Sequence, residues 1–404
     1  MRVLLVHCRY QIRGGEDECV EFERRLLHDA GIEVDLYEDD NRRVDETGRL
    51  RAAVDTVWST RSHRAIRERL RAGVYDVVHV HNFFPLISPA VHHAARAEGC
   101  AVVQTLHNYR LLCPNGIFFR DGRVCEDCLG RSVAWPAVAH ACYRGSRPAS
   151  AAIAAMLSTH RLLGTWRDKV DAFIALNEFG RRKFIEGGLP AERIVVKPNF
   201  VTPDPGVGDG RGGFALFVGR LTPEKGVATL IEAWRRLGDR IPLKIVGDGP
   251  LIEQVAEAAA EVPGIEFLGR RPLAEFYDLA GRASVFVFPS TWYEGFPRVI
   301  MECFARGTPI VASAIGPIAE VVSDGATGVH FRAGDAQDLA AKVERLLARP
   351  GALASMREAA RAEFEAKYTA KIALERTLAV YQRAIARRRD LPEGQLVAAG
   401  SAPR

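Results

Sequence analysis

Residues 214–226 read Phe-Ala-Leu-Phe-Val-Gly-Arg-Leu-Thr-Pro-Glu-Lys-Gly, a short apolar run followed by a polar loop. An apolar run of this length, bounded by glycine and proline, is typical of a buried strand. A helical stretch follows the loop, and the same alternation of strand and helix occupies most of the chain. Such alternation predicts parallel βαβ units.

The alternation forms two sets of predicted strands, one in each half of the chain. They cover residues 3–6, 32–36, 76–80, 101–106, 172–176 and 193–197, and then 214–218, 243–246, 265–268, 285–288, 309–312 and 328–331. Prolines and glycines cluster at 198–213, which predicts an interdomain linker and hinge there. We therefore expect an α/β protein with two doubly wound, Rossmann-like domains that face each other across a cleft.

The predicted domain boundaries follow from this linker. The N-terminal domain covers 1–200 and contains an irregular insertion at 108–147, while the C-terminal domain covers 201–375. A helix at 376–390 is expected to pack back on the N-terminal domain, and 391–404 to form a disordered tail.

Composition excludes several classes of protein. The 404 residues are 48% hydrophobic and 26% charged, which excludes a disordered chain, a fibrous repeat or a bare coiled coil. The net charge of +5 (55 basic against 50 acidic residues) does not demand nucleic acid as a partner. Because no apolar run reaches the ~18 residues of a membrane span and the apolar N-terminus is too short for a signal sequence, we expect a cytoplasmic protein.

A second loop, at 290–302, reads Ser-Thr-Trp-Tyr-Glu-Gly-Phe-Pro-Arg-Val-Ile-Met-Glu and also follows a predicted strand. Pro297 falls near the first position of the next helix, where its missing N–H matters least. A helix N-terminus at the carboxyl end of a parallel strand can bind a phosphate. Glu294 could reach a sugar and Glu302 the vicinal hydroxyls of a ribose, although spacing alone favours two solvated glutamates.

The spacing Glu294-x7-Glu302 resembles the E-x7-E motif of retaining family 4 glycosyltransferases, which have the GT-B fold. Further motifs match in the family's order, and the resemblance covers nearly the whole chain. They are Gly295, Phe296 and Pro297 after the first glutamate, Gly219, Arg220 and Lys225 in a G-R-L-x-x-x-K-G loop, Gly247 and Gly249 in a G-x-G-P turn, Gly14 and Gly15 in a G-G-x-E loop, and Lys197-Pro-Asn199.

The resemblance implies a hexosyltransferase that moves a sugar from a nucleotide-diphosphate sugar to a glycan or lipid-linked acceptor, in cell-surface polysaccharide or glycolipid synthesis. It places Arg220 and Lys225 on the donor diphosphate, Gly247 and Gly249 beside the nucleotide, and His107 on the transferred sugar. The expected catalytic residues are therefore His107, Glu294, Arg220 and Lys225. Retention of the anomeric configuration rests on the resemblance alone.

The residue chemistry fits this reading independently. When a nucleoside diphosphate leaves, negative charge grows on its phosphates, and preorganised cations can stabilise that charge without a metal. The sequence contains no Asp-x-Asp, the short acidic motif of metal-dependent glycosyltransferases. We therefore expect that catalysis requires no cofactor and no metal.

On the N-terminal side, His107 follows a predicted strand at the edge where parallel sheets bind ligands. His81 and Asn82 follow the preceding strand, and Gly14 and Gly15 would let a ligand approach the backbone closely. We expect these residues on the acceptor side. Taken alone, each histidine could instead be an ordinary core residue, and the two glycines could form an ordinary turn between a strand and a helix.

Two further features concern metal and membrane. The spacing of Cys113, Cys125, Cys128 and Cys142 could supply four thiolates to a structural zinc, with buried free thiols as the alternative. Residues 49–71 hold seven arginines interleaved with apolar residues, which predicts a basic amphipathic helix. Such a helix can contact an anionic membrane or pack through its apolar face.

Other functions remain as alternatives at this point. A nucleotide-sugar epimerase or phosphorylase could use the same two-domain plan, and so could a non-catalytic nucleotide-binding protein. An NAD-dependent oxidoreductase is disfavoured because no G-x-G-x-x-G follows a predicted strand.

Overall fold

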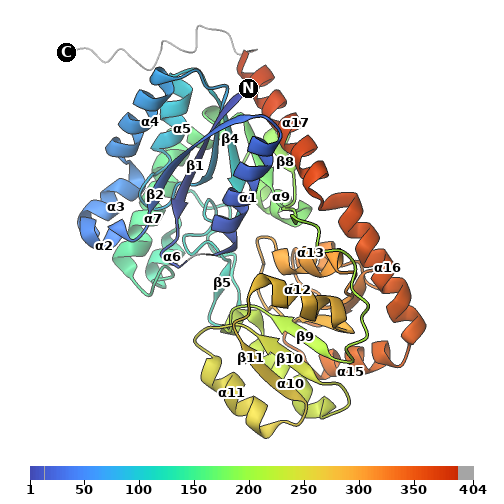
Figure 1. Cartoon of the computed structure of the whole chain (residues 1–404). Helices are drawn as coiled ribbons and strands as arrows, with labels where there is room; N and C mark the ends of the chain where they lie inside the picture. The colour runs from blue at the N-terminus through green and yellow to red at the C-terminus, as the bar shows by residue number, and fades with distance from the viewer. Residues whose placement is uncertain (13, 390–404) are drawn as a thin grey trace, which may run out of the picture. The chain divides into compact units, whose positions relative to one another are not determined.

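The computed structural model describes residues 1–12 and 14–389, so the predicted tail lies outside the described residues. The chain divides into two compact units (Figure 1). The first unit contains residues 1–116, 126–197 and the chain from Leu374 on, and the second contains Ile117–Cys125 and Pro198–Ala373. Each unit is built on a parallel sheet with helices, as predicted.

In its described residues, the first unit has a six-stranded sheet in the order β2-β1-β3-β4-β7-β8, with all neighbours parallel. Every strand predicted for the first half is present. The strands are β1 (Arg2–Arg9), β2 (Glu33–Asp40), β3 (Val77–Asn82), β4 (Ala101–Leu106), β7 (Ala172–Ala175) and β8 (Ile194–Val196).

The helices of the first unit connect these strands. They are α1 (Gly15–Asp29), α2 (Arg43–Thr47), α3 (Arg49–Val57), α4 (Thr60–Ala72), α5 (Ala90–Ala97), α6 (Trp135–Ala139), α7 (Arg147–Leu162), α8 (Thr165–Asp168), α9 (Glu178–Glu186) and the 3₁₀ turn η1 (Ala191–Arg193). Helix α17 (Ala370–Arg389) begins in the second unit and ends in the first. There Val380, Tyr381 and Ala384 are buried against β1, β3 and β4.

The predicted basic helix at 49–71 is two helices instead of one. Helix α3 ends at Val57, and Trp58 takes an extended conformation (φ −149°, ψ 106°). Ser59 then caps α4, because its side chain accepts a hydrogen bond from the backbone N–H of Ser62. The pattern of arginines and apolar residues continues across the break, so it predicted one helix where the structure has two.

The insertion at 108–147 is more regular than predicted. It contains α6 and an antiparallel hairpin of β5 (Phe119–Arg120) and β6 (Arg123–Val124). The hairpin belongs to the second unit, where the buried ring of Phe118 lies 6.4 Å from that of Tyr293. Part of the segment assigned to the N-terminal domain therefore packs with the other unit.

The second unit's described residues form a six-stranded parallel sheet in the order β11-β10-β9-β12-β13-β14. Its strands are β9 (Ala215–Val218), β10 (Leu243–Val246), β11 (Ile265–Gly269), β12 (Val285–Phe288), β13 (Ile310–Ser313) and β14 (Gly328–Phe331). Its helices are η2 (Pro223–Lys225), α10 (Val227–Leu237), α11 (Ile252–Glu261), α12 (Leu273–Arg282), α13 (Arg298–Ala305), α14 (Ile318–Val321), α15 (Ala336–Leu347) and α16 (Pro350–Lys367).

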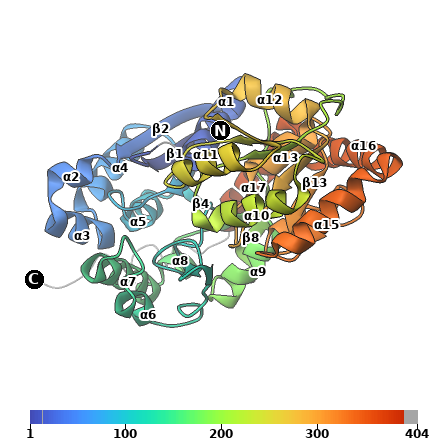
Figure 2. The same cartoon turned by 90° about the horizontal axis from the view of Figure 1, so that it is seen from below.

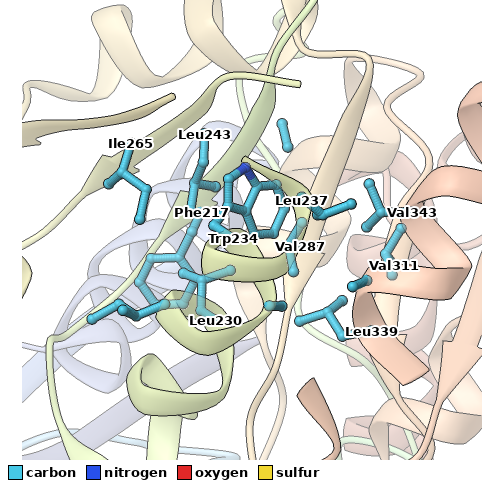
Figure 3. Close-up of a cluster of buried hydrophobic side chains, with 14 of the residues drawn as sticks. Phe217, Leu230, Trp234, Leu237, Leu243, Ile265, Val287, Val311, Leu339 and Val343 are labelled. Atoms are coloured by element: carbon cyan, nitrogen blue, oxygen red, sulfur yellow. The ribbon is translucent and has the colours of Figure 1, made fainter. Parts of the chain in front are cut away.

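Side chains that alternate along β9 and β12 divide between two hydrophobic cores. Phe217 and Val287 pack with Leu230, Trp234 and other residues of α10 and α15 (Figure 3). The intervening residues of both strands join α12, α13 and α16 in the second core. Alternation arises because successive side chains of a strand point to opposite faces. Helices α10 and α15 accordingly lie side by side against one face (Figure 2).

The Pro/Gly stretch predicted as linker is bound along the second unit over much of its length. The backbone N–H groups of Gly208, Gly210 and Gly212 donate to carbonyls at Arg306, Gly281 and Arg282, respectively. Arg357 donates to the carbonyls of Gly208 and Gly281. These glycines therefore allow close packing, and residues 208–212 form part of the second unit.

Candidate functional site

The candidate site residues of the second unit follow β9 and β12, which are adjacent although far apart in the chain. The strand order reverses here, since β10 lies on the other side of β9. In doubly wound sheets, ligands bind at the carboxyl ends of the strands beside such a reversal. The loops at 219–226 and 289–297 both start at this position.

Glu294 is held by three donors from these two loops. Its Oε1 lies 2.7 Å from Lys225 Nζ, 2.7 Å from Ser290 Oγ and 2.9 Å from Trp292 Nε1. The Glu294 side chain is 7% exposed, so the carboxylate is almost fully buried. The structure therefore brings together Glu294 and Lys225, which lie 69 residues apart in sequence.

Lys225 retains access to solvent, because its side chain is 16% exposed. Its ammonium lies 5.5 Å from the centre of the Trp292 ring and 5.7 Å from that of Phe288. Arg220 is exposed on the same loop. The site thus presents positive charge at the strand ends with a fixed carboxylate behind it.

Gly226 determines how closely the two loops approach. Its φ of +72° favours glycine, and a Cβ at this position would lie 1.9 Å from the carbonyl oxygen of Pro289. The backbone N–H of Thr291 donates to the carbonyl of Glu224 at 2.9 Å, which also ties the loops together. The close approach positions Lys225 next to Glu294.

Gly247 and Gly249 serve a similar purpose on the neighbouring loop after β10. A Cβ on Gly247 would lie 2.0 Å from the carbonyl oxygen of Gly219, and one on Gly249 would lie 2.6 Å from that of Leu221. Larger residues would separate the two loops. The predicted G-x-G-P turn therefore supports the loop that carries Arg220 and Lys225.

Glu302 lies on α13, in the helix that follows the Glu294 loop. Its Oε1 is 3.2 Å from Arg298 Nη2, and both side chains are about one-tenth exposed. Pro297 is the residue directly before the helix, near its first position as predicted, and Gly295 and Phe296 are half-buried in the preceding loop. The ring of Phe296 lies 6.1 Å from that of Tyr368.

In the first unit, a small pocket lies at the ends of β3 and β4. His81, Asn82 and His107 line it, as predicted for this edge. His81 Nδ1 is 3.0 Å from His107 Nε2. Asn82 has a structural role, since its amide donates to the carbonyl of Cys8 at 2.7 Å and accepts from the N–H of Phe84 at 2.9 Å.

Gly14 and Gly15 begin α1 after β1. Asp17 Oδ2 accepts from the N–H of Gly14 at 2.8 Å, and Asp17 Oδ1 lies 2.8 Å from His7 Nε2. A Cβ on either glycine would meet nothing within 4 Å. Packing within the chain therefore does not require glycine at these two positions.

Sequence reasoning missed a buried polar group beneath the His81–His107 pair. Lys197 Nζ lies 2.7 Å from Glu23 Oε2, and Glu23 Oε1 lies 3.2 Å from His79 Nδ1. His79 Nδ1 is also 2.8 Å from the hydroxyl of Tyr381. One signal was present: Glu23 occupies the same buried face of α1 as Val20 and Leu27.

The four cysteines of the predicted zinc site are divided between the units. Cys125 belongs to the second unit and Cys113, Cys128 and Cys142 to the first. Among the described residues, Glu23, His79 and His81 form a group of potential metal ligands within 4.8 Å of one another, and these cysteines form none. The zinc site stays a prediction without structural support.

The two parallel sheets and their strand-end loops define a GT-B fold. HepE of Anabaena in complex with UDP has the same fold, with a TM-score of 0.68 and 17% identity over 95% of this chain and 100% of that one. The profile described as Glycosyl transferases group 1 matches residues 208–363, and that of Glycosyltransferase Family 4 matches 14–205. The chain belongs to this family of group 1, family 4 glycosyltransferases.

Curated relatives match over part of their length. Alpha-maltose-1-phosphate synthase of Mycobacterium tuberculosis is 34% identical over 43% of this chain and 48% of its own. Phosphatidyl-myo-inositol mannosyltransferase of Mycobacterium leprae is 32% identical over 55% of this chain and 61% of its own. The chain thus spans about half the length of these relatives.

The contact at Gly226 yields a prediction about stability. Gly226→Ala should destabilise the second unit more than Gly325→Ala, because both glycines have a positive φ but a Cβ on Gly325 meets nothing within 4 Å. We expect a difference of at least about 1 kcal/mol, or roughly 2–4 °C in the melting temperature of a domain of this size. Thermal unfolding followed by circular dichroism measures it, and equal melting temperatures would contradict the role of Gly226.

Proposed function

We propose that this chain is a retaining, metal-independent glycosyltransferase that moves a sugar from a nucleotide-diphosphate sugar to a glycan or lipid-linked acceptor. The observation that carries the proposal is the Lys225–Glu294 pair, with Nζ and Oε1 2.7 Å apart at the carboxyl ends of β9 and β12. The donor would bind there, with its diphosphate near Arg220 and Lys225. The Anabaena relative, whose structure contains UDP, supports a nucleotide ligand.

The positive charge at this site would favour the departure of a nucleoside diphosphate. Lys225 is held beside Glu294 before any ligand arrives, so its charge needs little reorganisation when negative charge grows on the phosphates. Glu294 fixes this ammonium and would contact the sugar, while Glu302 would bind the ribose. In the proposed reaction the leaving phosphate assists attack by the acceptor hydroxyl on the same face of the sugar.

The first unit would bind the acceptor and contribute His107 to the transferred sugar. The acceptor class is proposed from two relatives, an amylovoran biosynthesis glycosyltransferase of Erwinia amylovora and the phosphatidyl-myo-inositol mannosyltransferase of Mycobacterium leprae. We place the reaction in the cytoplasm, in the synthesis of a cell-surface polysaccharide or glycolipid. An epimerase or a non-catalytic nucleotide-binding protein is less consistent with the family to which the chain belongs.

Turnover with a panel of nucleotide sugars tests the proposal. The purified protein should release nucleoside diphosphate slowly from one donor by hydrolysis, and faster with acceptor present. EDTA should leave this rate within about twofold, since fixed cations replace a metal. NMR of the product should show the donor's anomeric configuration. Loss of activity in EDTA that Mg²⁺ or Mn²⁺ restores would contradict metal independence, and an inverted product would contradict retention.

Two glutamate variants separate donor binding from turnover. Glu302→Ala should weaken binding of UDP by about 1–3 kcal/mol through loss of charge-assisted hydrogen bonds. Glu294→Gln should chiefly lower turnover of the intact donor. Isothermal titration and initial rates measure the two effects. Glu266→Gln is the matched control, because Glu266 also pairs with a lysine of this unit but lies on β11. Wild-type values in both test variants would exclude the proposed donor site.

We further propose that α3 contacts an anionic membrane where a lipid-linked acceptor would reside. Leu50 and Val54 of this helix are 87% and 62% exposed. Arginines of the next helix, α4, form ion pairs within the unit, such as Arg67 with Glu98 and Arg61 with Asp39. The proposed contact is therefore assigned to α3 and its exposed apolar residues, and not to α4. No helix within residues 1–12 and 14–389 is both long and apolar enough to cross a bilayer, so only a peripheral contact is proposed.

Vesicle binding checks this contact. The protein should sediment with vesicles that contain phosphatidylglycerol and much less with pure phosphatidylcholine. Replacing Leu50 and Val54 together by serine should reduce sedimentation several-fold. Leu273→Ser, at an exposed leucine of α12, is the control and should have no effect. Equal sedimentation with neutral and anionic vesicles would contradict the proposal.

A further inference from the structure

The buried polar group of the first unit extends from Lys197 to the pocket. Lys197 Nζ lies 2.7 Å from Glu23 Oε2, and the other carboxylate oxygen, Oε1, lies 3.9 Å from His81 Nε2. His81 Nδ1 in turn lies 3.0 Å from His107 Nε2. Lys197, Glu23 and His81 are each at most 5% exposed, whereas His107 lines the pocket.

The geometry does not favour a metal at Glu23, His79 and His81, although their ligand atoms lie close together. The ammonium of Lys197 already neutralises Glu23 at 2.7 Å. Both ring nitrogens of His79 are also engaged, Nδ1 at 2.8 Å from the hydroxyl of Tyr381 and Nε2 at 2.8 Å from Thr105 Oγ1. The group is therefore an internally balanced network.

The two histidines nearest the pocket are neutral at pH 7. Burial, together with the neighbouring His79, holds the pKa of His81 well below its usual range. Loss of solvation, with a contribution from His7, lowers the pKa of His107 to about 3. Burial alone would raise the pKa of Glu23, but Lys197 and the histidines hold it well below its usual range. Glu23 is therefore a carboxylate, and each of these two rings carries one proton.

Glu23 Oε1, which lies 3.2 Å from His79 Nδ1, also faces His81 Nε2, a buried nitrogen without a hydrogen-bond partner. Their separation of 3.9 Å is too long for a hydrogen bond. The field of the carboxylate still acts at this distance inside a protein, and it favours an N–H over a lone pair on the facing nitrogen. A proton on His81 Nε2 leaves His81 Nδ1 as an acceptor, so the proton shared with His107 must belong to His107 Nε2.

We propose that Glu23 is a positioning residue that sets the tautomers of His81 and, through it, of His107. Both rings carry their proton on Nε2. His107 Nδ1 is then a bare nitrogen, able to accept a hydrogen bond but not to donate one. Such a group recognises a ligand O–H and disfavours a phosphate or carbonyl oxygen. The ligand class that follows is a sugar hydroxyl, and this last step rests on the proposed function.

Nitrogen NMR of ¹⁵N-histidine-labelled wild-type protein tests the tautomers directly. In a neutral imidazole the protonated and bare nitrogens have well-separated ¹⁵N shifts, and couplings to the ring protons assign them. His81→Gln and His107→Gln serve only to assign the resonances. The expected result is a proton on Nε2 of both rings at pH 7. A proton on Nδ1 of either ring would overturn the proposal, and this measurement does not depend on enzyme activity.

Glu23→Gln then tests the cause. Lys197 should hold the amide oxygen of the glutamine, which leaves its NH₂ facing His81 Nε2. The NH₂ presents positive charge to that nitrogen and favours a lone pair on it, so both tautomers should switch to Nδ1–H. Tyr381→Phe is the control, because it removes a hydroxyl from the same network next to His79. Unchanged tautomers in folded Glu23→Gln, or a switch in Tyr381→Phe, would show that Glu23 does not set them.

Kinetics connect the tautomer to the ligand. Glu23→Gln should lower kcat for sugar transfer at least tenfold and leave the Kd of UDP within twofold, because UDP is proposed to bind the second unit. A tautomer switch with unchanged kcat would overturn the link to the sugar hydroxyl. If wild-type protein transferred no sugar but showed both Nε2–H tautomers, the proposed function would fail while the role of Glu23 stood.

Discussion

Parallel strand pairing is the constraint on which the rest of the structure depends. A parallel sheet gathers the carboxyl ends of its strands at one edge, and a reversal of strand order leaves room there between loops that lead to helices on opposite faces. In the second unit the reversal lies between β9 and β12, and in the first between β1 and β3. Lys225 and Glu294 follow β9 and β12, respectively, while Gly14 and Gly15 follow β1 and His81 is the last residue but one of β3.

Each unit uses a lysine–glutamate pair with an N–O distance of 2.7 Å, but the two pairs differ in exposure. The Lys197 side chain is 3% exposed, and burial at this level is tolerable because its charge is paired directly with that of Glu23. The Lys225 side chain is 16% exposed. The same kind of ion pair can therefore stabilise a buried network in the first unit and leave an ammonium group accessible to solvent in the second.

The sequence predicted the parts that depend on local patterns. Short apolar runs between breakers located the strands of both six-stranded sheets, because a strand buried on both faces has few other sequence solutions, whereas the short β5–β6 hairpin was not predicted. The loops with Lys225 and Glu294 were predicted as well, since they contain glycine and proline at fixed spacing and resemble known motifs. The shared site of these two residues follows from strand order, which a single sequence does not display.

Other features could not be predicted because they depend on distant partners. Glu23 was visible only as a glutamate on an apolar face, and its partners Lys197 and His79 come from separate elements. The predicted helix at 49–71 is interrupted at Trp58 and Ser59, where the sequence has no proline or glycine. Helix propensities therefore did not predict the break. The glycines at 208–212 indicated flexibility, whereas arginine side chains and backbone carbonyls bind this segment.

The contribution of α17 to the first unit has a consequence for how the protein is made. Val380, Tyr381 and Ala384 complete a core whose other members include Val3 and Leu5, at the opposite end of the described chain. Synthesis is vectorial, and domains generally fold as their residues emerge from the ribosome. All of Pro198–Ala373 emerges before Tyr381, so the second unit can complete its core first. The first unit can therefore complete its core only after the residues of the second unit have been synthesised.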